Sequence, residues 1–315
     1  MTIRVSTIIP AYNNAATIAQ ALDSALAQNF DGQEIIVVLD GGTDSTALIL
    51  SGYGDRIRTV EQPNRGFNRS RNGGIRLARG QYLAFLDADD IWLPGRLALT
   101  CAALDRNPDA VMAFTDVIPM NERGDLGPPR IVGSSPTLAD LMSRGWRIYP
   151  SAVTIRREIV EACGGFSEEL TNLSDTYLWM RARELGPFEY LTEPLVIYRT
   201  IDFHRIGDKC HGFGRFARVV RRRYGRAARR VIADCAESLA GSLVAKAVIQ
   251  RDRGELLPAC RSIMRAIWRS PRYLFKYGLV SHLFGRSNLR HIVGSAFNGT
   301  QPGAHSSPSS PRIER

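Results

Sequence analysis

The sequence has few cysteines, and none of them is arranged for a metal site or a short redox motif. The five cysteines lie far apart, at positions 101, 163, 210, 235 and 260, with no CxxC pair and no Cys/His spacing typical of zinc. Widely spaced single cysteines are typical of reduced, buried thiols in a cytosolic protein. We therefore expect no disulfide framework and no structural zinc site.

The chain also lacks a long uncharged apolar run. No stretch approaches the roughly 18 consecutive apolar residues that indicate a membrane-spanning helix. The first residues, MTIRVSTIIPAYNN, contain one Arg and only a short apolar run before Pro10, which is too short for the core of a secretory signal. We therefore expect a cytoplasmic protein, either soluble or bound at the inner face of the cell membrane.

Acidic residues become scarce beyond residue 198. Residues 1–198 contain 24 Asp and Glu against 18 Lys and Arg, a net charge of −6, whereas residues 199–315 contain 7 against 23, a net charge of +16. A basic segment of this kind suits nucleic acid, anionic lipid or an acidic acceptor, and charge alone does not separate these partners. The stretch 215–230 has few aromatic residues for stacking on bases and no recognised reading module, so nucleic acid is not expected.

Bulky apolar and basic side chains interleave farther along the basic segment, over residues 261–286. This composition favours docking on an anionic membrane surface, with an ordinary solvated helix face as the alternative. The last residues, 299–315, are rich in Ser and Pro and are expected to form a disordered tail.

Apolar segments are plentiful, since 44% of the residues are hydrophobic, which is enough for a sizeable core. Short apolar runs typical of buried strands alternate with segments of helical spacing. The expected strands are residues 5–9, 34–39, 57–61, 81–87, 111–117, 152–156 and 195–199. The expected helices are residues 15–27, 46–50, 69–78, 94–106, 175–184, 214–233 and 235–249. The alternation predicts a parallel sheet in the N-terminal half, covered on both faces.

Polar clusters follow three of the expected strands, at residues 10–13, 40–44 and 87–90. Ligands of such sheets bind beyond the carboxyl ends of the strands, so these clusters should meet in one crevice. Asp87 and Asp89, two residues apart, can share one divalent cation, and their hard oxygen ligands favour Mg²⁺ or Mn²⁺. Taken alone, such a cluster can equally be a solvated turn or a helix cap.

Four motifs occur in order: PAYN at 10–13, DGGTD at 40–44, an Asn, Gly and Arg-rich stretch at 64–74, and DADD at 87–90. With them, the chain resembles glycosyltransferase family 2, the inverting enzymes of the GT-A fold, over residues 5–200. The resemblance implies an α/β fold, a Rossmann-like mixed sheet flanked by helices, here with a C-terminal basic helical extension. The implied divisions are a catalytic domain at 1–205, made of a nucleotide-sugar half (1–118) and an acceptor half (119–205), then the basic helical extension at 206–298 and the tail at 299–315.

The resemblance also implies the residues that bind the donor. Ala11 and Tyr12 would border the base, Asp40 would accept a hydrogen bond from a pyrimidine imide, and Arg71 would face the diphosphate. Asp87 and Asp89 would hold the metal, with His204 as a further candidate ligand. The implied nucleotide-sugar-binding residues are Pro10, Ala11, Tyr12, Asn13, Asp40, Asn64, Gly66, Arg71, Asn72, Asp87, Ala88 and Asp89.

The family's general base aligns with Asp175, at the end of the stretch GGFSEELTNLSD (164–175). An inverting transfer needs one base that takes the proton of the attacking hydroxyl. The alternative role of Asp175 is the N-cap of the following helix. Leu39 and Ser174 depart from the acidic residues usual at their positions. Trp179 could stack on an acceptor sugar, but a place in the core is favoured.

These features predict an inverting, metal-dependent glycosyltransferase that uses a UDP- or dTDP-sugar. The acceptor would be a hydroxyl of a cell-surface polysaccharide or a lipid-linked glycan precursor. One alternative is a nucleotidyltransferase, although residues 10–17 lack the Gly-rich basic loop usual there. The other is a non-catalytic protein that binds sugar nucleotides with the same fold.

Overall fold

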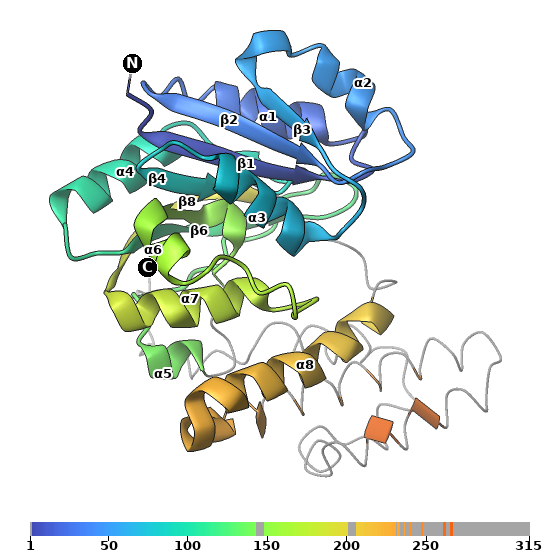
Figure 1. Cartoon of the computed structure of the whole chain (residues 1–315), viewed down its shortest axis with the longest axis vertical. Coiled ribbons are helices and arrows are strands. Elements are labelled where there is room, and N and C mark those ends of the chain that lie inside the picture. The colour runs from blue at the N-terminus through green and yellow to red at the C-terminus, as the bar shows by residue number, and fades with distance from the viewer. Residues whose placement is uncertain are drawn as a thin grey trace, which may run out of the picture. The chain divides into compact units, whose positions relative to one another are not determined.

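The computed structural model of the protein describes residues 2–142, 148–200 and 206–230, with the side chains of α8 described from residue 214, and scattered positions between 232 and 266 (Figure 1). The chain divides into two compact units, Met1–Ala236 and Glu237–Arg315. All but a few of the described residues belong to the first unit. His204 and most of the basic segment lie outside the described residues.

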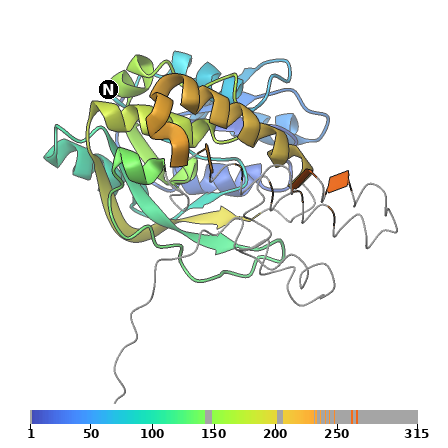
Figure 2. The same cartoon turned by 90° about the horizontal axis from the view of Figure 1, so that it is seen from below.

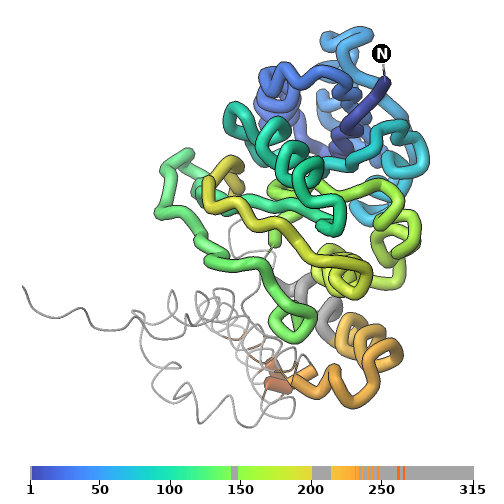
Figure 3. Tube along the Cα trace, turned by 90° about the vertical axis from the view of Figure 1, so that its left-hand side faces the viewer, coloured from blue at the N-terminus to red at the C-terminus, as the bar shows by residue number. Residues whose placement is uncertain are grey.

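An eight-stranded mixed sheet forms the centre of the first unit, in the order β3-β2-β1-β4-β7-β6-β8-β5. The strands are β1 Val5–Ala11, β2 Gln33–Leu39, β3 Arg58–Glu61, β4 Tyr82–Phe85, β5 Ile91–Trp92, β6 Met112–Met120, β7 Val153–Arg156 and β8 Phe188–Arg199. The first four strands are parallel, as the sequence predicted for this half. Strand β7 runs antiparallel to β4 and β6, whereas β6 and β8 run parallel, side by side (Figure 3).

Helices cover both faces of the sheet, as expected. The helices are α1 Ile18–Leu26, α2 Thr46–Ser51, α3 Phe67–Leu77, α4 Arg96–Arg106, α5 Leu138–Leu141, α6 Arg157–Ala162, α7 Ser174–Leu185 and α8 Ile206–Tyr224, with 3-10 turns η1 Gly54–Arg56, η2 Pro150–Ala152 and η4 Gly225–Ala228. Successive residues of β1 point to opposite faces, so Ile8 packs in the cluster with α7 and α8, and Ile9 in the cluster with α1 and α4. Figure 2 shows α8, in orange, alongside α7.

Pro10 marks the point where β1 separates from β4. The carbonyl of Ile8 accepts from Leu86, which places the amide edge of Ile8 and of residue 10 on the β4 side. The β1–β4 pairing ends at Ile8, so the missing N–H of Pro10 leaves no ladder bond unmade. Since β2 and β4 flank β1 on opposite sides, this is the switch point of the sheet, where ligands of such folds bind.

Candidate active site

The loops after β1 and β2 are tied together at this edge of the sheet. Asn13, which has a left-handed backbone (φ 52°), accepts a hydrogen bond from the Thr43 amide at 2.8 Å through its side chain. Asp44 accepts one from the Ala15 amide at 2.9 Å. The predicted meeting of residues 10–13 and 40–44 is therefore confirmed. Tyr12 and Asn13 are exposed on this loop pair and available to a ligand.

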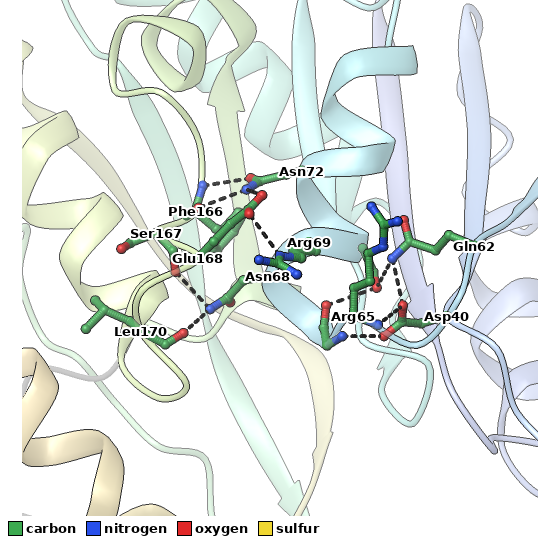
Figure 4. A network of polar contacts seen from close by, with 12 residues as sticks. Asp40, Gln62, Arg65, Asn68, Arg69, Asn72, Phe166, Ser167, Glu168 and Leu170 are labelled. Atoms are coloured by element: carbon green, nitrogen blue, oxygen red, sulfur yellow. Dashed lines mark hydrogen bonds and ion pairs between the residues drawn. The ribbon is translucent and has the colours of Figure 1, made fainter.

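Asp40 anchors the next loop rather than facing solvent. Its carboxylate accepts from Gln62 Nε2 at 2.6 Å and from the amides of Arg65 and Gly66 at 2.9 and 2.7 Å (Figure 4). The residue is 3% exposed. Three internal donors surround this buried carboxylate, and its predicted contact with a base imide stays a prediction. Asn64 stays exposed on the loop that Asp40 holds.

The first turns of α3 also form hydrogen bonds with the loop that precedes α7. The Asn72 side chain donates to the Phe166 carbonyl and accepts from the Phe166 amide, both at 2.9 Å (Figure 4). A Cβ on Gly165 would lie 2.6 Å from Asn72 Oδ1, so only glycine allows this approach. Asn72 thus positions a loop, and its predicted role as a ligand of the donor stays a prediction.

Gly74, in the same helix, faces strand β1 at close range. A Cβ there would lie 2.5 Å from Ile8 Cγ2. The glycine lets α3 pack closely on β1, and this packing fixes the depth at which the polar residues of α3 meet the sheet edge.

Arg71 joins the end of β4 to the start of α7. Its guanidinium donates from Nη2 to Asp87 Oδ1 at 2.5 Å and lies 5.2 Å from the centre of the Phe166 ring. The side chain is 10% exposed, and Nε is buried without a partner among the described residues. Burial opposes the charge of Arg71, but the nearby charges of Asp87, Asp175 and Asp90 outweigh it and raise the pKa.

Asp175 is the second residue of α7, not its N-cap. Leu173, with φ 60°, precedes the helix, so the N-cap alternative from the sequence is wrong. Asp175 Oδ1 accepts from the Thr176 amide at 2.7 Å. Burial raises the pKa of the Asp175 carboxyl, while the Thr176 hydrogen bond and the charge of Arg71 act against that rise. Asp175 therefore shares one electrostatic environment with Asp87 and Arg71.

Ser174, which replaces an acidic residue of the family pattern, has a structural role. Its hydroxyl donates to Asn68 Oδ1 at 2.5 Å. Asn68 Nδ2 in turn donates to the carbonyls of Ser167 and Leu170. The departure at Ser174 therefore adds a hydrogen bond that ties the start of α7, and with it Asp175, to α3.

The acidic loop after β4 places its carboxylates in different surroundings. Asp90 is 1% exposed and accepts from the Ser151 hydroxyl at 2.5 Å and from the Arg199 amide at 2.9 Å. The Asp87 side chain is 25% exposed. Burial, and then the charge of Asp87, raise the pKa of Asp89 to about 6. Asp90 thus fixes the loop, while Asp87 and Asp89 remain near the crevice.

Ser151 and Arg199 complete this loop, and sequence reasoning missed both. The Ser151 hydroxyl accepts from the Asp87 amide at 3.0 Å, and Arg199 Nε donates to the Asp89 carbonyl at 3.0 Å. They come from η2 and the end of β8, about 60 and 110 positions from the residues they bind. No local pattern could reveal them, because only the closing of the sheet brings them together.

The acidic loop suits a divalent cation only with help from a substrate. Among the described residues, no group of three or more His, Cys, Asp or Glu side chains could hold a metal ion. Asp87 and Asp89 supply two hard oxygen ligands, and the oxygens of a diphosphate can supply more. Burial and the nearby charge of Asp87 raise the pKa of Asp89, and a bound cation would offset the repulsion between the two carboxylates. His204, the further candidate ligand, lies outside the described residues.

Several predicted ligands are buried in the core. Ala11 and Ala88 are 1% and 4% exposed, and Pro10 is buried in β1, while their predicted part in donor binding stays a prediction. Trp179 is 1% exposed and donates from Nε1 to the Ile148 carbonyl at 3.1 Å. The preference for a core Trp179 is confirmed, and the weaker prediction of an acceptor contact is corrected.

Comparison with known sequences gives a consistent family. A profile described as Glycosyl transferase family 2 matches residues 6–164, half of the chain. An uncharacterized glycosyltransferase of Rickettsia felis is 30% identical over 196 residues, covering 59% of this chain and 32% of that relative. The chain spans a third or less of the length of the first curated relatives that it matches.

Solved structures share the fold. Residues 1–349 of S. aureus TarS in complex with UDP match with a TM-score of 0.60 and 17% identity, covering 88% of this chain and 92% of that chain. The mannosyltransferase PcManGT of Pyrobaculum calidifontis, in complex with GDP-Man and Mn²⁺, matches with a TM-score of 0.54 and 17% identity, covering 94% and 87%. At these identities the likeness shows the fold, a mixed α/β sheet with flanking helices of the GT-A type, as the sequence predicted.

Proposed function

Because the chain belongs to glycosyltransferase family 2, we propose that it transfers a sugar from a nucleoside diphosphate to an acceptor hydroxyl, with inversion at the anomeric carbon. The observation that carries this proposal is the buried Arg71, which hydrogen-bonds Asp87 and feels the charge of Asp175. Asp87, the proposed donor-binding carboxylate, and Asp175, the candidate base, therefore both interact electrostatically with Arg71 near the switch point of the sheet. UDP or dTDP is the proposed carrier, and the complex of TarS with UDP supports this choice.

The donor would lie along the exposed parts of the site. Tyr12, Asn13 and Asn64 are exposed at the ends of β1 and β3 and would border the nucleoside. Asp87 and Asp89 would hold Mg²⁺ or Mn²⁺ against the diphosphate. When bound, the cation would neutralise the charge that develops on the leaving diphosphate. The Mn²⁺ bound with GDP-Man in PcManGT supports this cofactor proposal.

Asp175 is the proposed general base. The acceptor oxygen forms a bond to C1 of the sugar, the bond from C1 to the diphosphate oxygen breaks, and the acceptor proton passes to the Asp175 carboxylate. A carboxylate whose pKa is raised by burial is a stronger base than one in water, which suits this step. The charge of Arg71 acts against that rise and so favours the ionised carboxylate that can accept the proton.

Product analysis tests the reaction class. The protein, with Mn²⁺, would be incubated with UDP-, dTDP- and GDP-sugars and an acceptor extract, and the small products separated by anion exchange. Transfer or slow hydrolysis releases the nucleoside diphosphate and no sugar 1-phosphate. In a parallel incubation with added pyrophosphate, release of a nucleoside triphosphate and a sugar 1-phosphate would instead favour a nucleotidyltransferase. Binding of the donor without turnover would favour a non-catalytic protein.

For the acceptor, we propose a cell-surface polysaccharide or a lipid-linked glycan precursor, met at the inner face of the cell membrane. Among the described residues, no helix is long and apolar enough to cross a membrane. Surface docking through α8 is supported by its two faces. One face is buried in the core and the other exposes arginines that form no ion pair within the described part of the chain. The buried residues are Phe216, Val219 and Val220, and the exposed ones include Arg215, Arg218 and Arg221.

Vesicle sedimentation tests this docking. The protein is expected to sediment with phosphatidylglycerol vesicles, not with phosphatidylcholine vesicles, and to be released by salt. Changing Arg215, Arg218 and Arg221 to Glu should abolish sedimentation, whereas the change of Arg123, on a distant loop, to Glu should not. Equal binding to both kinds of vesicle would contradict the membrane proposal. Binding to duplex DNA without binding to either vesicle would also contradict it.

The division of the chain at residues 205 and 298 also remains a proposal.

A further inference from the structure

A second aromatic and basic cluster lies on the acceptor half. The Arg130 cluster consists of Arg130, Tyr149 and Tyr198. The two rings are 4.2 Å apart between centres and inclined by 42°, and the Arg130 guanidinium lies 5.8 Å from each ring centre. Arg130 Nη1 donates to the Tyr149 hydroxyl at 2.5 Å. All three side chains are partly exposed.

The Arg130 cluster borders the acidic loop. Tyr198 directly precedes Arg199, whose amide donates to Asp90 and whose Nε donates to the Asp89 carbonyl. Burial, and then the charge of Asp90, raise the pKa of the Tyr198 hydroxyl, with smaller contributions from Asp87 and Asp89. The aromatic pair is therefore next to the carboxylates of the proposed donor site.

The loop that carries Arg130 is fastened to the sheet. The Arg130 amide donates to the Val117 carbonyl at 2.8 Å, and the Val132 amide donates to Asp116 Oδ1 at 2.8 Å. The Tyr190 hydroxyl donates to Asp116 Oδ2 at 2.7 Å. Asp116 is 1% exposed, so a buried carboxylate forms the hydrogen bonds that hold this surface loop on the sheet. Arg130 is thereby held in place before any ligand arrives.

Arg130 carries a charge that no carboxylate balances. It forms no ion pair within the described part of the chain, in contrast with Arg71, which pairs with Asp87. The guanidinium has five N–H donors, and only one is used by the Tyr149 hydroxyl. A planar cation beside two rings can bind an anionic group while the rings contact the flat face of a sugar.

We propose that the Arg130 cluster is the acceptor subsite and selects an acceptor whose sugar ring carries an anionic group, a phosphate or a carboxylate. The inference rests on the proposed glycosyl transfer and names its acceptor class. Tyr149 and Tyr198 contact the ring, and Arg130 binds the anion. The acceptor hydroxyl is then presented to the donor held at the neighbouring acidic loop.

Ligand-observed NMR with three small probes tests the subsite: glucose 6-phosphate, glucuronate and glucose. The two anions should bind at least tenfold more tightly than glucose, and the tighter of the two identifies phosphate or carboxylate as the anionic group. Arg130→Gln should weaken both anions about tenfold and leave glucose unchanged. The matched change Arg123→Gln, on the same loop, should leave all three unchanged.

Two further variants separate binding from loop structure. Arg130→Lys keeps the charge without the planar fork and should restore part of the loss. Tyr149→Phe removes only the hydroxyl that Arg130 contacts and should weaken the anions about threefold. The proposal is overturned if glucose binds as tightly as the anions, or if Arg130→Gln has no effect.

A measurement of donor binding distinguishes failure of the acceptor-subsite proposal from failure of the proposed glycosyl transfer. Binding of the UDP-sugar with Mn²⁺ should be the same in wild type and Arg130→Gln. Loss of donor binding in the variant would assign Arg130 to the donor site and overturn the acceptor subsite. Absence of donor binding in the wild type, with the probes still bound, would contradict the proposed function alone.

Discussion

Arg71 donates a hydrogen bond to Asp87 across the junction of α3 and β4, and its guanidinium is almost completely removed from solvent. The pair connects α3 to the loop that would bind the donor, and the charge of Asp175 on α7 also acts on Arg71. Neither charge is well solvated, so each depends on the other.

Replacing Arg71 by Met should therefore cost about 2–4 kcal/mol of unfolding free energy, because Asp87 and Asp175 lose their nearest positive charge. The matched change is Arg69→Met, two residues earlier in α3, which removes an exposed ion pair with Glu168. That control should cost about 0–1 kcal/mol. Urea unfolding at pH 7 measures both, and equal costs would contradict the special position of Arg71.

Ser151→Ala should weaken metal binding more than it weakens the fold. The hydroxyl links Asp90 to the backbone of Asp87, so its loss frees the acidic loop. We expect about a tenfold loss of Mn²⁺ affinity in the presence of nucleotide, measured by calorimetry. The control Ser51→Ala removes an exposed hydroxyl bonded to the Leu48 carbonyl and should leave the affinity unchanged. Unchanged affinity in Ser151→Ala would exclude its role in positioning the loop.

The adjacent glycines of α3 should respond oppositely to Ala. Gly74→Ala places a methyl 2.5 Å from Ile8 and should cost about 1–3 kcal/mol, since α3 must move off the sheet. The nearest atom to the methyl group of Gly73→Ala is Gln62 Oε1 at 3.3 Å, and Val38 and Arg76 are at ordinary contact distances. This substitution should be neutral or stabilising by up to about 1 kcal/mol, because Ala favours the helix. Thermal unfolding of the two variants checks the difference, and a destabilised Gly73→Ala would show that α3 packs otherwise.

Glu34 should make the stability depend on pH. Burial would raise the pKa of its carboxyl, but hydrogen bonds from Ser6 and Arg79 outweigh burial and lower the pKa below 4.5. A lowered folded pKa gives stability that is present above the unfolded pKa, near 4.5, and is lost as the pH falls through the folded pKa. Glu34→Gln should therefore cost about 1 kcal/mol at pH 7 and little at pH 3. Urea titrations at both pH values measure this, with the exposed Glu61→Gln as control, and an equal cost at both would contradict it.

The sequence predicted the N-terminal sheet well because β1, β2 and β4 are short, mostly apolar runs buried on both faces. Residues 34–39 and 81–87 correspond to β2 and β4 with small errors at their ends. Strand β5 was missed because two residues, Ile91 and Trp92, carry no periodic signal. Strand β8 extends well beyond the predicted 195–199, since half of it is polar and only its pairing with β6 defines it.

At the site, the sequence indicated which loops meet but not which side chains face the crevice. Asp40 and Asn72 were expected to touch the donor, and the structure shows that both also hold backbone groups of neighbouring loops. A carboxylate or amide in a motif can serve either purpose, and local sequence does not distinguish them. Ser151 and Arg199 depend on contacts far along the chain, so they required the structure.

Asp175→Asn gives the most direct test of the central claim, that the carboxylate at the start of α7 takes the proton of the acceptor. Transfer and donor binding should be measured on the same preparation, with a UDP-sugar, Mn²⁺ and acceptor, alongside the exposed control Asp109→Asn. The account predicts a loss of at least a hundredfold in transfer, with donor affinity within about twofold of wild type and the control fully active. Transfer that survives in Asp175→Asn at the rate of the control would contradict it.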